Sequence, residues 1–376
     1  MTVAKNTPAI ALGADDVIPR DHCPVCAGGD LVAYEKLTFR EITIPYQRCR
    51  ACDLVFMNPV PNQARYDRLY GQAFWETKSA KAAEAEHLAR QKQLIKELQR
   101  TEKLCATLDA MGCAPPRGGR ILEIGCAFGL IISTIADHYQ TQAFGVEPSE
   151  LAAGFAKTLC GVKILAPTIE KLNEAGPRSN VQSDDQSGGQ MDLILFSHVM
   201  ENVVDLNIVF QVIEKWLAPG GVVLMETPNS TVQKSTHIYH PYCFSRTSLR
   251  RLYGKHGFEI ISLRASGRPS SALIPRYLTL VARRGNTTGT AANTTTGANI
   301  NGGLDRRIGH GWRQTIKRTP LKYLDRILTR ILYAPDRAAR LRAAELARAH
   351  GNESGNEGKL SGGNGGGRGV DGQAHH

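Results

Sequence analysis

The feature that most constrains this fold is the regular alternation of strand-like and helix-like segments between residues 120 and 284. Short apolar runs predict strands, and the amphipathic stretches between them predict helices. Such alternation favours the α/β class, with a parallel sheet covered by helices on both faces. The predicted strands are 120–124, 142–146, 162–165, 191–196, 220–226, 258–264 and 276–283. The predicted helices lie near 129–138, 149–160, 205–217 and 245–256.

The last two predicted strands are joined by the segment ASGRPSSALIP, which shows no helix pattern. Parallel neighbours need a long crossover connection, whereas antiparallel neighbours can be joined by a short loop. We therefore expect a seven-stranded sheet whose last strand is antiparallel to the others.

Composition divides the rest of the chain. A stretch rich in Ala, Glu, Lys, Gln and Leu without Gly or Pro favours a helix, and Gly-, Asn- and Thr-rich stretches favour linkers or disorder. We predict a loose leader at 1–20, a four-cysteine module at 21–75, a connecting helix at 78–110, the α/β domain at 111–284, a flexible linker at 285–304, basic helices at 305–350 and a disordered tail at 351–376.

The net charge of +11 is concentrated near the C-terminus. Residues 305–350 hold twelve Lys and Arg against four Asp and Glu, so most of the chain is close to neutral and is a poor match for nucleic acid. No apolar run approaches the ~18 residues that span a membrane, and the N-terminus lacks a signal-peptide pattern. A cytoplasmic location is therefore expected, and the nine cysteines are not expected to form a disulfide framework.

The stretch RILEIGCAFGLIIS at 120–133 predicts a buried strand, a glycine turn and a helix. A dinucleotide site needs G-x-G-x-x-G, but Ala127 and Leu130 stand at the second and third glycine positions after Gly125. The loop therefore favours a ligand without a pyrophosphate.

Two acids accompany this loop. Glu123 lies at the tip of the predicted strand, and Glu147 ends the next strand, where a carboxylate can accept both hydroxyls of a ribose. Glu123 is open to a second interpretation, as a cap of the following helix. Cys126 is interpreted as a small packing residue rather than a nucleophile.

At this point the chain resembles the class I S-adenosylmethionine-dependent methyltransferases over residues 85–284. LEIGCAFG is similar to their first motif, MDLILFSHVMENVVDL to their fourth strand and the loop that faces the methyl donor, and LAPGGVVLMETPN to their fifth strand. The resemblance implies S-adenosylmethionine as cofactor, with Glu123 holding its amino group. It assigns donor binding to Glu123, Gly125, Cys126, Ala127, Gly129, Glu147, Ser197 and His198.

Four cysteines form two C-x2-C pairs, Cys23 with Cys26 and Cys49 with Cys52. Two such knuckles can supply four thiolates to a tetrahedral zinc ion, and a closed shell of this kind is structural. Redox pairs and unpaired buried thiols are the alternatives. The segment resembles the N-terminal zinc module of bacterial methyltransferases that act on nucleotide-linked sugars and surface polysaccharides, which implies a sugar-containing or lipid-linked acceptor.

Proton removal from such an acceptor needs a base, and histidine is the usual base near neutral pH. His240 is our first candidate and His198 the second, because both follow predicted strands of the sheet. Tyr239 and His240 also resemble the start of a tyrosine–histidine loop in sugar C-methyltransferases. In ubiquinone-type O-methyltransferases an E-x-x-E-H motif binds a divalent metal. Here that stretch holds His198, Glu201 and Asn202, so no catalytic metal is predicted.

The leading hypothesis is therefore methyl transfer from S-adenosylmethionine to a hydroxyl or carbon of a sugar-containing or lipid-linked small molecule. The alternative is a zinc-ribbon, nucleic-acid-associated protein whose methyltransferase-like fold is inactive. Four basic and five acidic residues in 21–60 speak against nucleic acid as a partner.

The basic segment near the C-terminus predicts an amphipathic helix. Leu321, Leu324, Leu328 and Ile331 recur at steps of three and four residues. Docking on the methyltransferase domain, binding to a membrane surface and binding to nucleic acid are the three interpretations. We favour an anionic membrane surface as the partner of residues 312–350, which would place the protein peripherally at the inner membrane face.

Overall fold

The computed structural model describes residues 17–39, 42–64, 66, 83–177, 189–285, 321–335 and 339–345. The chain divides into two compact units, one of residues 1–80 and 96–334, the other of residues 81–95 and 335–376. Helix α2 (Ala83–Ala110) begins in the second unit, whose other described part is helical at 339–345. Everything below concerns the first unit.

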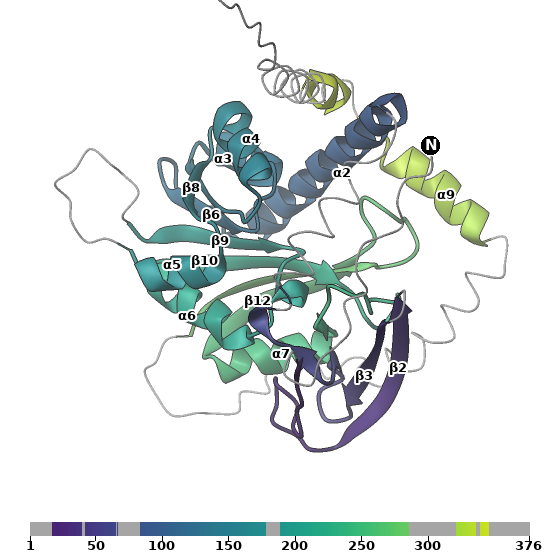
Figure 1. Cartoon of the computed structure of the whole chain (residues 1–376). Coiled ribbons are helices and arrows are strands. Elements are labelled where there is room, and N and C mark those ends of the chain that lie inside the picture. Colours follow the sequence, from purple (N-terminus) through teal and green to yellow (C-terminus); the bar gives the residue numbers. More distant parts are fainter. Residues whose placement is uncertain are drawn as a thin grey trace, which may run out of the picture. The chain divides into compact units, whose positions relative to one another are not determined.

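A seven-stranded mixed sheet forms its centre, in the order β12-β13-β10-β9-β6-β7-β8 (Figure 1). As predicted, the β13 strand runs antiparallel to both of its neighbours, while the strands from β10 to β8 are parallel. The strands are β6 (Arg120–Ile124), β7 (Gln142–Val146), β8 (Lys163–Ala166), β9 (Met191–Ser197), β10 (Leu217–Pro228), β12 (Phe258–Ser266) and β13 (Tyr277–Arg284).

Helices cover both faces of this sheet (Figure 1). Alternate residues of one strand enter different cores, as the two-residue period of a strand requires. Ile121 packs with α2, α3 and α4 on one face, and Leu122 packs with α5, α6 and α7 on the other. The helices are α3 (Leu130–Tyr139), α4 (Glu150–Cys160), α5 (Ile169–Ala175), α6 (Leu206–Trp216) and α7 (Arg246–Lys255).

The observed strands and helices agree closely with the predicted ranges, and three differences have physical reasons. Helix α5 was not predicted, because seven residues capped by Thr168 are too short to show a helical period. Strand β10 begins at Leu217, three residues before the predicted start. Leu217 already pairs with Met191 of β9, and the register then shifts between Leu217 and Val222. The predicted loose leader at 1–20 extends too far, because Val17 and Ile18 form strand β1 (Val17–Ile18), which pairs with β5 (Val60–Pro61).

The N-terminal cysteine segment forms a four-stranded sheet in the order β11-β4-β3-β2. Its strands are β2 (Leu31–Phe39), β3 (Ile42–Cys49), β4 (Val55–Met57) and β11 (Tyr242–Cys243). Strand β11 comes from the segment that follows β10, so the predicted module at 21–75 recruits its last strand from far along the chain. Cys49 and Phe56 also share one hydrophobic core with Leu249 of α7.

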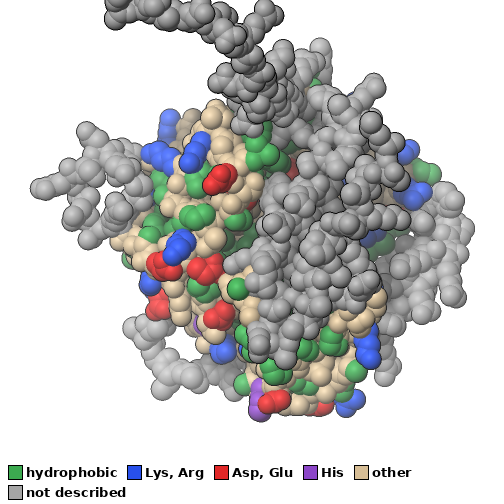
Figure 2. Space-filling model, viewed as in Figure 1, with side chains coloured by type: hydrophobic (Ala, Val, Ile, Leu, Met, Phe, Trp, Pro, Cys, Tyr) green, Lys and Arg blue, Asp and Glu red, His purple; other side chains and the backbone are tan. Residues whose placement is uncertain are grey.

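Near the C-terminus, helix α9 (Leu321–Leu332) lies within the predicted basic region. Its Asp325 is 7% exposed and contacts the connection between β12 and β13. Among the described residues, no helix is both long and apolar enough to cross a bilayer. On the face seen in Figure 2, basic and acidic side chains of the described surface are interspersed.

Several predictions lie wholly or largely outside the described residues. They are the first sixteen residues of the leader, residues 67–75 of the cysteine module, residues 78–82 of the connecting helix, the linker after residue 285, the tail at 351–376, and residues 312–320, 336–338 and 346–350 of the proposed membrane segment.

Candidate functional site

The glycine loop follows β6 and turns into α3, as the sequence predicted. Gly125 and Gly129 have φ values of 70° and 76°, in the left-handed region that glycine tolerates. Ala127 also has a positive φ, 48°, which costs an L-residue roughly 1–2 kcal/mol. The N–H groups of Gly125 and Cys126 both donate to the carbonyl of Val146, which fixes the loop to the end of β7.

Glu147 stands directly after β7 and is 6% exposed. Its two carboxylate oxygens accept hydrogen bonds from the N–H groups of Ala127 and Ser149, each at 2.9 Å. Glu147 therefore holds the glycine loop in place.

Glu123 is buried at the tip of β6, with 2% of its surface exposed. Burial, and next the charge of Glu97, raise the pKa of the Glu123 carboxyl well above its ordinary value. The N–H of Ile132 in the first turn of α3 opposes this shift, in keeping with the capping interpretation. The Oε2 atom has no hydrogen-bond partner. A cationic ligand group beside it would stabilise the charged carboxylate.

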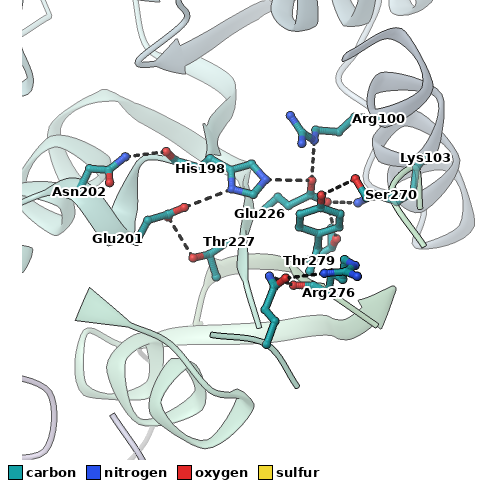
Figure 3. Close-up of polar contacts among 12 residues, drawn as sticks. Arg100, Lys103, His198, Glu201, Asn202, Glu226, Thr227, Ser270, Arg276 and Thr279 are labelled. Carbon is teal, nitrogen blue, oxygen red and sulfur yellow. Dashed lines mark hydrogen bonds and ion pairs between the residues drawn. The ribbon is translucent and has the colours of Figure 1, made fainter. Parts of the chain in front are cut away.

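His198 follows β9 and lies at the centre of a polar cluster (Figure 3). Its φ of 59° is strained for a residue with a side chain, as is common at functional sites. Its Nδ1 lies 3.2 Å from Glu201 Oε1, and its Nε2 lies 3.6 Å from Glu226 Oε1 but makes no hydrogen bond. The hydroxyl of the preceding Ser197 is also buried without a partner.

Burial and mutual contact determine the charges of His198 and Glu201. Burial lowers the pKa of His198, and Glu201 only partly restores it. Burial alone would raise the pKa of Glu201, but the hydrogen bond to His198 brings it below its ordinary value. At neutral pH the pair is therefore a neutral imidazole beside a carboxylate. The Thr227 hydroxyl, 2.9 Å away, donates to the second Glu201 oxygen.

The glycine loop and His198 are neighbours. A Cβ atom placed on Gly125 would lie only 2.6 Å from Val199 Cγ2, so the residue after His198 packs directly on the loop. A Cβ on Gly145 would likewise lie 2.5 Å from the Cys126 sulfur. Cys126 thus fills space between the loop and β7, as predicted, and burial raises the pKa of its thiol.

Sequence reasoning missed three charged residues of the cluster. Glu226 of β10 is fully buried, and Arg100 Nε of α2 lies 2.9 Å from its Oε1. Lys103 of α2 also pairs with Glu226. Burial and the charges of Arg100 and Arg268 lower the pKa of Lys103 to about 7, and the ion pair opposes that shift. Charges three residues apart on a helix look like a solvated face, so the sequence held no signal for them.

The loop of the first candidate base is held by the cysteine segment. The Tyr46 hydroxyl lies 2.7 and 2.8 Å from the carbonyls of His237 and His240, and the Tyr66 hydroxyl donates to the Tyr239 carbonyl at 2.7 Å. His240 Nδ1 lies 2.7 Å from the Ser235 carbonyl, an acceptor, so Nδ1 carries a proton. His240 is close enough to Glu201 to lower the pKa of that carboxyl.

The four predicted metal ligands converge. The sulfur atoms of Cys23, Cys26, Cys49 and Cys52 all lie within 4.8 Å of one another, with two pairs at 3.5 Å. A tetrahedral zinc with Zn–S bonds of about 2.3 Å needs sulfur atoms about 3.8 Å apart, so the cluster fits that ion. Three of these cysteines are buried, and four thiolates leave no coordination position open, which suits a structural role.

We predict one zinc ion per chain, and Cys23→Ser should reduce zinc to well below one equivalent in elemental analysis. Because β11 belongs to the same sheet as the cysteines, amide hydrogen exchange at residues 235–243 should accelerate in this variant.

Cys160→Ser, at a half-buried cysteine of α4, serves as the matched control and should retain the metal. A zinc-free wild-type protein with slow exchange at 235–243 would contradict the prediction.

Part of this chain is similar in sequence to known methyltransferases. Residues 96–263 match a protein family described as a methyltransferase domain. Ubiquinone biosynthesis O-methyltransferase from Rhizobium etli is 30% identical over 139 residues, covering 35% of this chain and 51% of that protein. The Agrobacterium fabrum protein of the same name is 32% identical over 124 residues, covering 32% and 44%. The chain thus spans about half the length of the first of these relatives.

Two solved structures that match part of this chain are also described as methyltransferases. Magnesium protoporphyrin IX methyltransferase from Synechocystis covers 59% of this chain and 100% of its own, with 13% identity and a TM-score of 0.41. An S-adenosylmethionine-dependent methyltransferase described as putative, from Listeria monocytogenes, covers 48% and 98%, with 15% identity and a TM-score of 0.35. By the family match and the curated relatives, residues 96–263 of this chain are similar to methyltransferase domains.

Proposed function

We propose that this protein transfers a methyl group from S-adenosylmethionine to a hydroxyl of a small-molecule acceptor, with His198 as the general base. The observation that carries the proposal is that, at the carboxyl ends of β6 and β9, three buried polar atoms lack a hydrogen-bond partner. They are Glu123 Oε2, Ser197 Oγ and His198 Nε2. Buried polar atoms are normally paired, so unpaired ones at one edge of a sheet favour a ligand site.

The donor-binding residues fit S-adenosylmethionine by their chemistry. When bound, this cofactor supplies a methyl group on a sulfonium, which needs alignment more than activation. The unpaired Glu123 carboxylate oxygen suits the amino group of its methionine part. Glu147 stands directly after β7, where an acid can accept the hydroxyls of a ribose, and its carboxylate holds the glycine loop through the N–H of Ala127.

His198 is positioned to remove a proton. The ionised Glu201 can only accept at Nδ1, so the neutral imidazole carries its proton there and presents a lone pair at Nε2. The acceptor hydroxyl would give its proton to Nε2 as its oxygen takes the methyl group from the sulfonium, whose sulfur would leave as a neutral thioether. The resulting imidazolium lies between the carboxylates of Glu201 and Glu226, which stabilise it. Glu201 is thus a positioning residue.

The acceptor we propose is a sugar-containing or lipid-linked small molecule, methylated on oxygen. The curated relatives are named O-methyltransferases, which favours oxygen over carbon. The resemblance of the cysteine segment to the module of sugar-modifying enzymes supports the sugar. That segment contacts the loop of Tyr239 and His240, so these two residues are proposed to contact the acceptor.

Replacing Glu123 by Gln should weaken S-adenosylmethionine binding about 10-fold or more, because a charge-assisted hydrogen bond to the amino group is lost. Wild-type affinity should rise with pH until Glu123 is fully ionised, since its pKa is raised and the cation binds the carboxylate form. The Glu123→Gln variant should lack this pH dependence.

Calorimetric titration from pH 5 to 8 measures both effects. Glu150→Gln, at an exposed acid beside the donor loop, is the matched control. Equal affinities for the Glu123→Gln variant and the wild-type protein would place the amino group elsewhere.

His198 should remain neutral, with its proton on Nδ1, at pH values below its ordinary pKa of 6.5. Glu201→Gln should lower the pKa of His198 further, because the carboxylate that favours the imidazolium is removed. Nitrogen-15 NMR of the imidazoles, with His198→Gln for assignment, reports both the charge and the tautomer. A protonated ring at pH 7, or a proton on Nε2 in the neutral ring, would contradict the assigned role.

The acceptor class can be tested with tritium-labelled methyl donor and three probes: a uridine-diphosphate sugar, a polyprenyl-diphosphate sugar and a polyprenylated phenol. Label should enter one of the two sugar compounds, and His198→Gln should reduce that rate about 10²–10⁴-fold. Label only in the phenol would overturn the sugar while leaving methyl transfer intact.

A further inference from the structure

Helix α9 is attached to the methyltransferase domain by its polar side. Asp325 Oδ1 accepts hydrogen bonds from the Ser271 hydroxyl at 2.8 Å and from the N–H groups of Ala272 and Leu273 at 3.0 and 2.9 Å. One turn later, the Thr329 hydroxyl oxygen lies 2.9 Å from the same Ala272 nitrogen. A buried carboxylate with three donors is a specific attachment, so the side of α9 that faces the domain is fixed.

The apolar side of α9 is consequently turned outward. Among the described residues, eight large apolar side chains are exposed, and half of them belong to this one helix. They are Leu324 at 45%, Ile327 at 55%, Ile331 at 67% and Leu332 at 62%. A helix that docks on its own domain normally buries its apolar stripe. Here Leu324, Ile327 and Ile331, which share one side of the helix, are exposed, and we call these three residues the outer stripe.

Charge indicates what the outer stripe contacts. Arg326 and Arg330 are exposed on α9, whereas Asp325, the only acid of the helix, is buried against the domain. The exposed surface of α9 is therefore apolar and cationic. Leu and Ile between arginines suit the interface of an anionic bilayer, where apolar side chains enter the acyl region and cations meet lipid phosphates.

The attachment also connects α9 to the candidate site. Ser270, beside the residues that bind Asp325, hydrogen-bonds the Tyr277 hydroxyl at 2.7 Å. The Tyr277 ring packs edge-on against His198, with ring centroids 5.3 Å apart. The segment that holds α9 is thus linked to His198 through Ser270 and Tyr277.

We propose that α9 is a docking face for an anionic lipid bilayer, held on the β12–β13 connection by Asp325. This inference concerns location and does not require that the methyl-transfer proposal be correct.

Vesicle co-sedimentation of the full chain tests it. The protein should bind phosphatidylglycerol-containing vesicles and bind pure phosphatidylcholine vesicles much more weakly. The double variant Ile327→Ser/Ile331→Ser should bind the anionic vesicles about tenfold less or worse, since both side chains are exposed and leave the bilayer without altering the core. Arg326→Ser/Arg330→Ser should lose about fivefold per arginine.

Leu151→Ser provides the matched control, because Leu151 is 56% exposed on α4, away from the outer stripe. Binding by Leu151→Ser should equal that of the wild type. No binding by the wild type, or equal binding by the wild type and the isoleucine double variant, would overturn the proposal. So would light scattering that shows a dimer which the double variant converts to a monomer, with vesicle binding unchanged.

Discussion

The site depends on one close approach between two loops at the C-terminal edge of the parallel strands. Gly125 has no side chain, and Val199 occupies the space where a Cβ would stand. Because strands β6 and β9 are neighbours in register, this contact brings the end of the donor loop beside His198. The glycine loop and the imidazole therefore lie next to each other. A larger residue at Gly125 would separate them even if each strand kept its place.

A second constraint comes from the cysteine segment. Its sheet takes up β11, and Tyr46 and Tyr66 hold the carbonyl groups of the loop at 237–240. Folding of the cysteine cluster and the shape of this loop are thus coupled. The cysteine segment also shares a hydrophobic core with the helices on one face of the large sheet.

Sequence reasoning recovered what local pattern encodes. Apolar runs located the seven strands, the short ASGRPSSALIP connection implied the antiparallel end, and the spacing of the cysteines implied their cluster. It missed what only long-range packing creates. Arg100 and Lys103 resemble ordinary helix charges until α2 packs beside Glu226. The β4–β11 pairing joins residues almost two hundred positions apart through two residue pairs, too few to show in a pattern. From the sequence, His240 ranked above His198 as the candidate base. That His198 Nε2 is buried without a hydrogen bond can be seen only in the structure.

The central claim is that the glycine loop and the His198–Glu201 pair form one methyl-transfer site. The most direct test is a crystal structure of the full chain with S-adenosylhomocysteine, the demethylated form of the donor. We predict that its amino group lies within hydrogen-bond distance of Glu123, its ribose hydroxyls lie against Glu147, and its sulfur lies on the side of His198 Nε2. A ligand bound elsewhere, or bound at the loop with His198 turned away from the sulfur, would contradict the account.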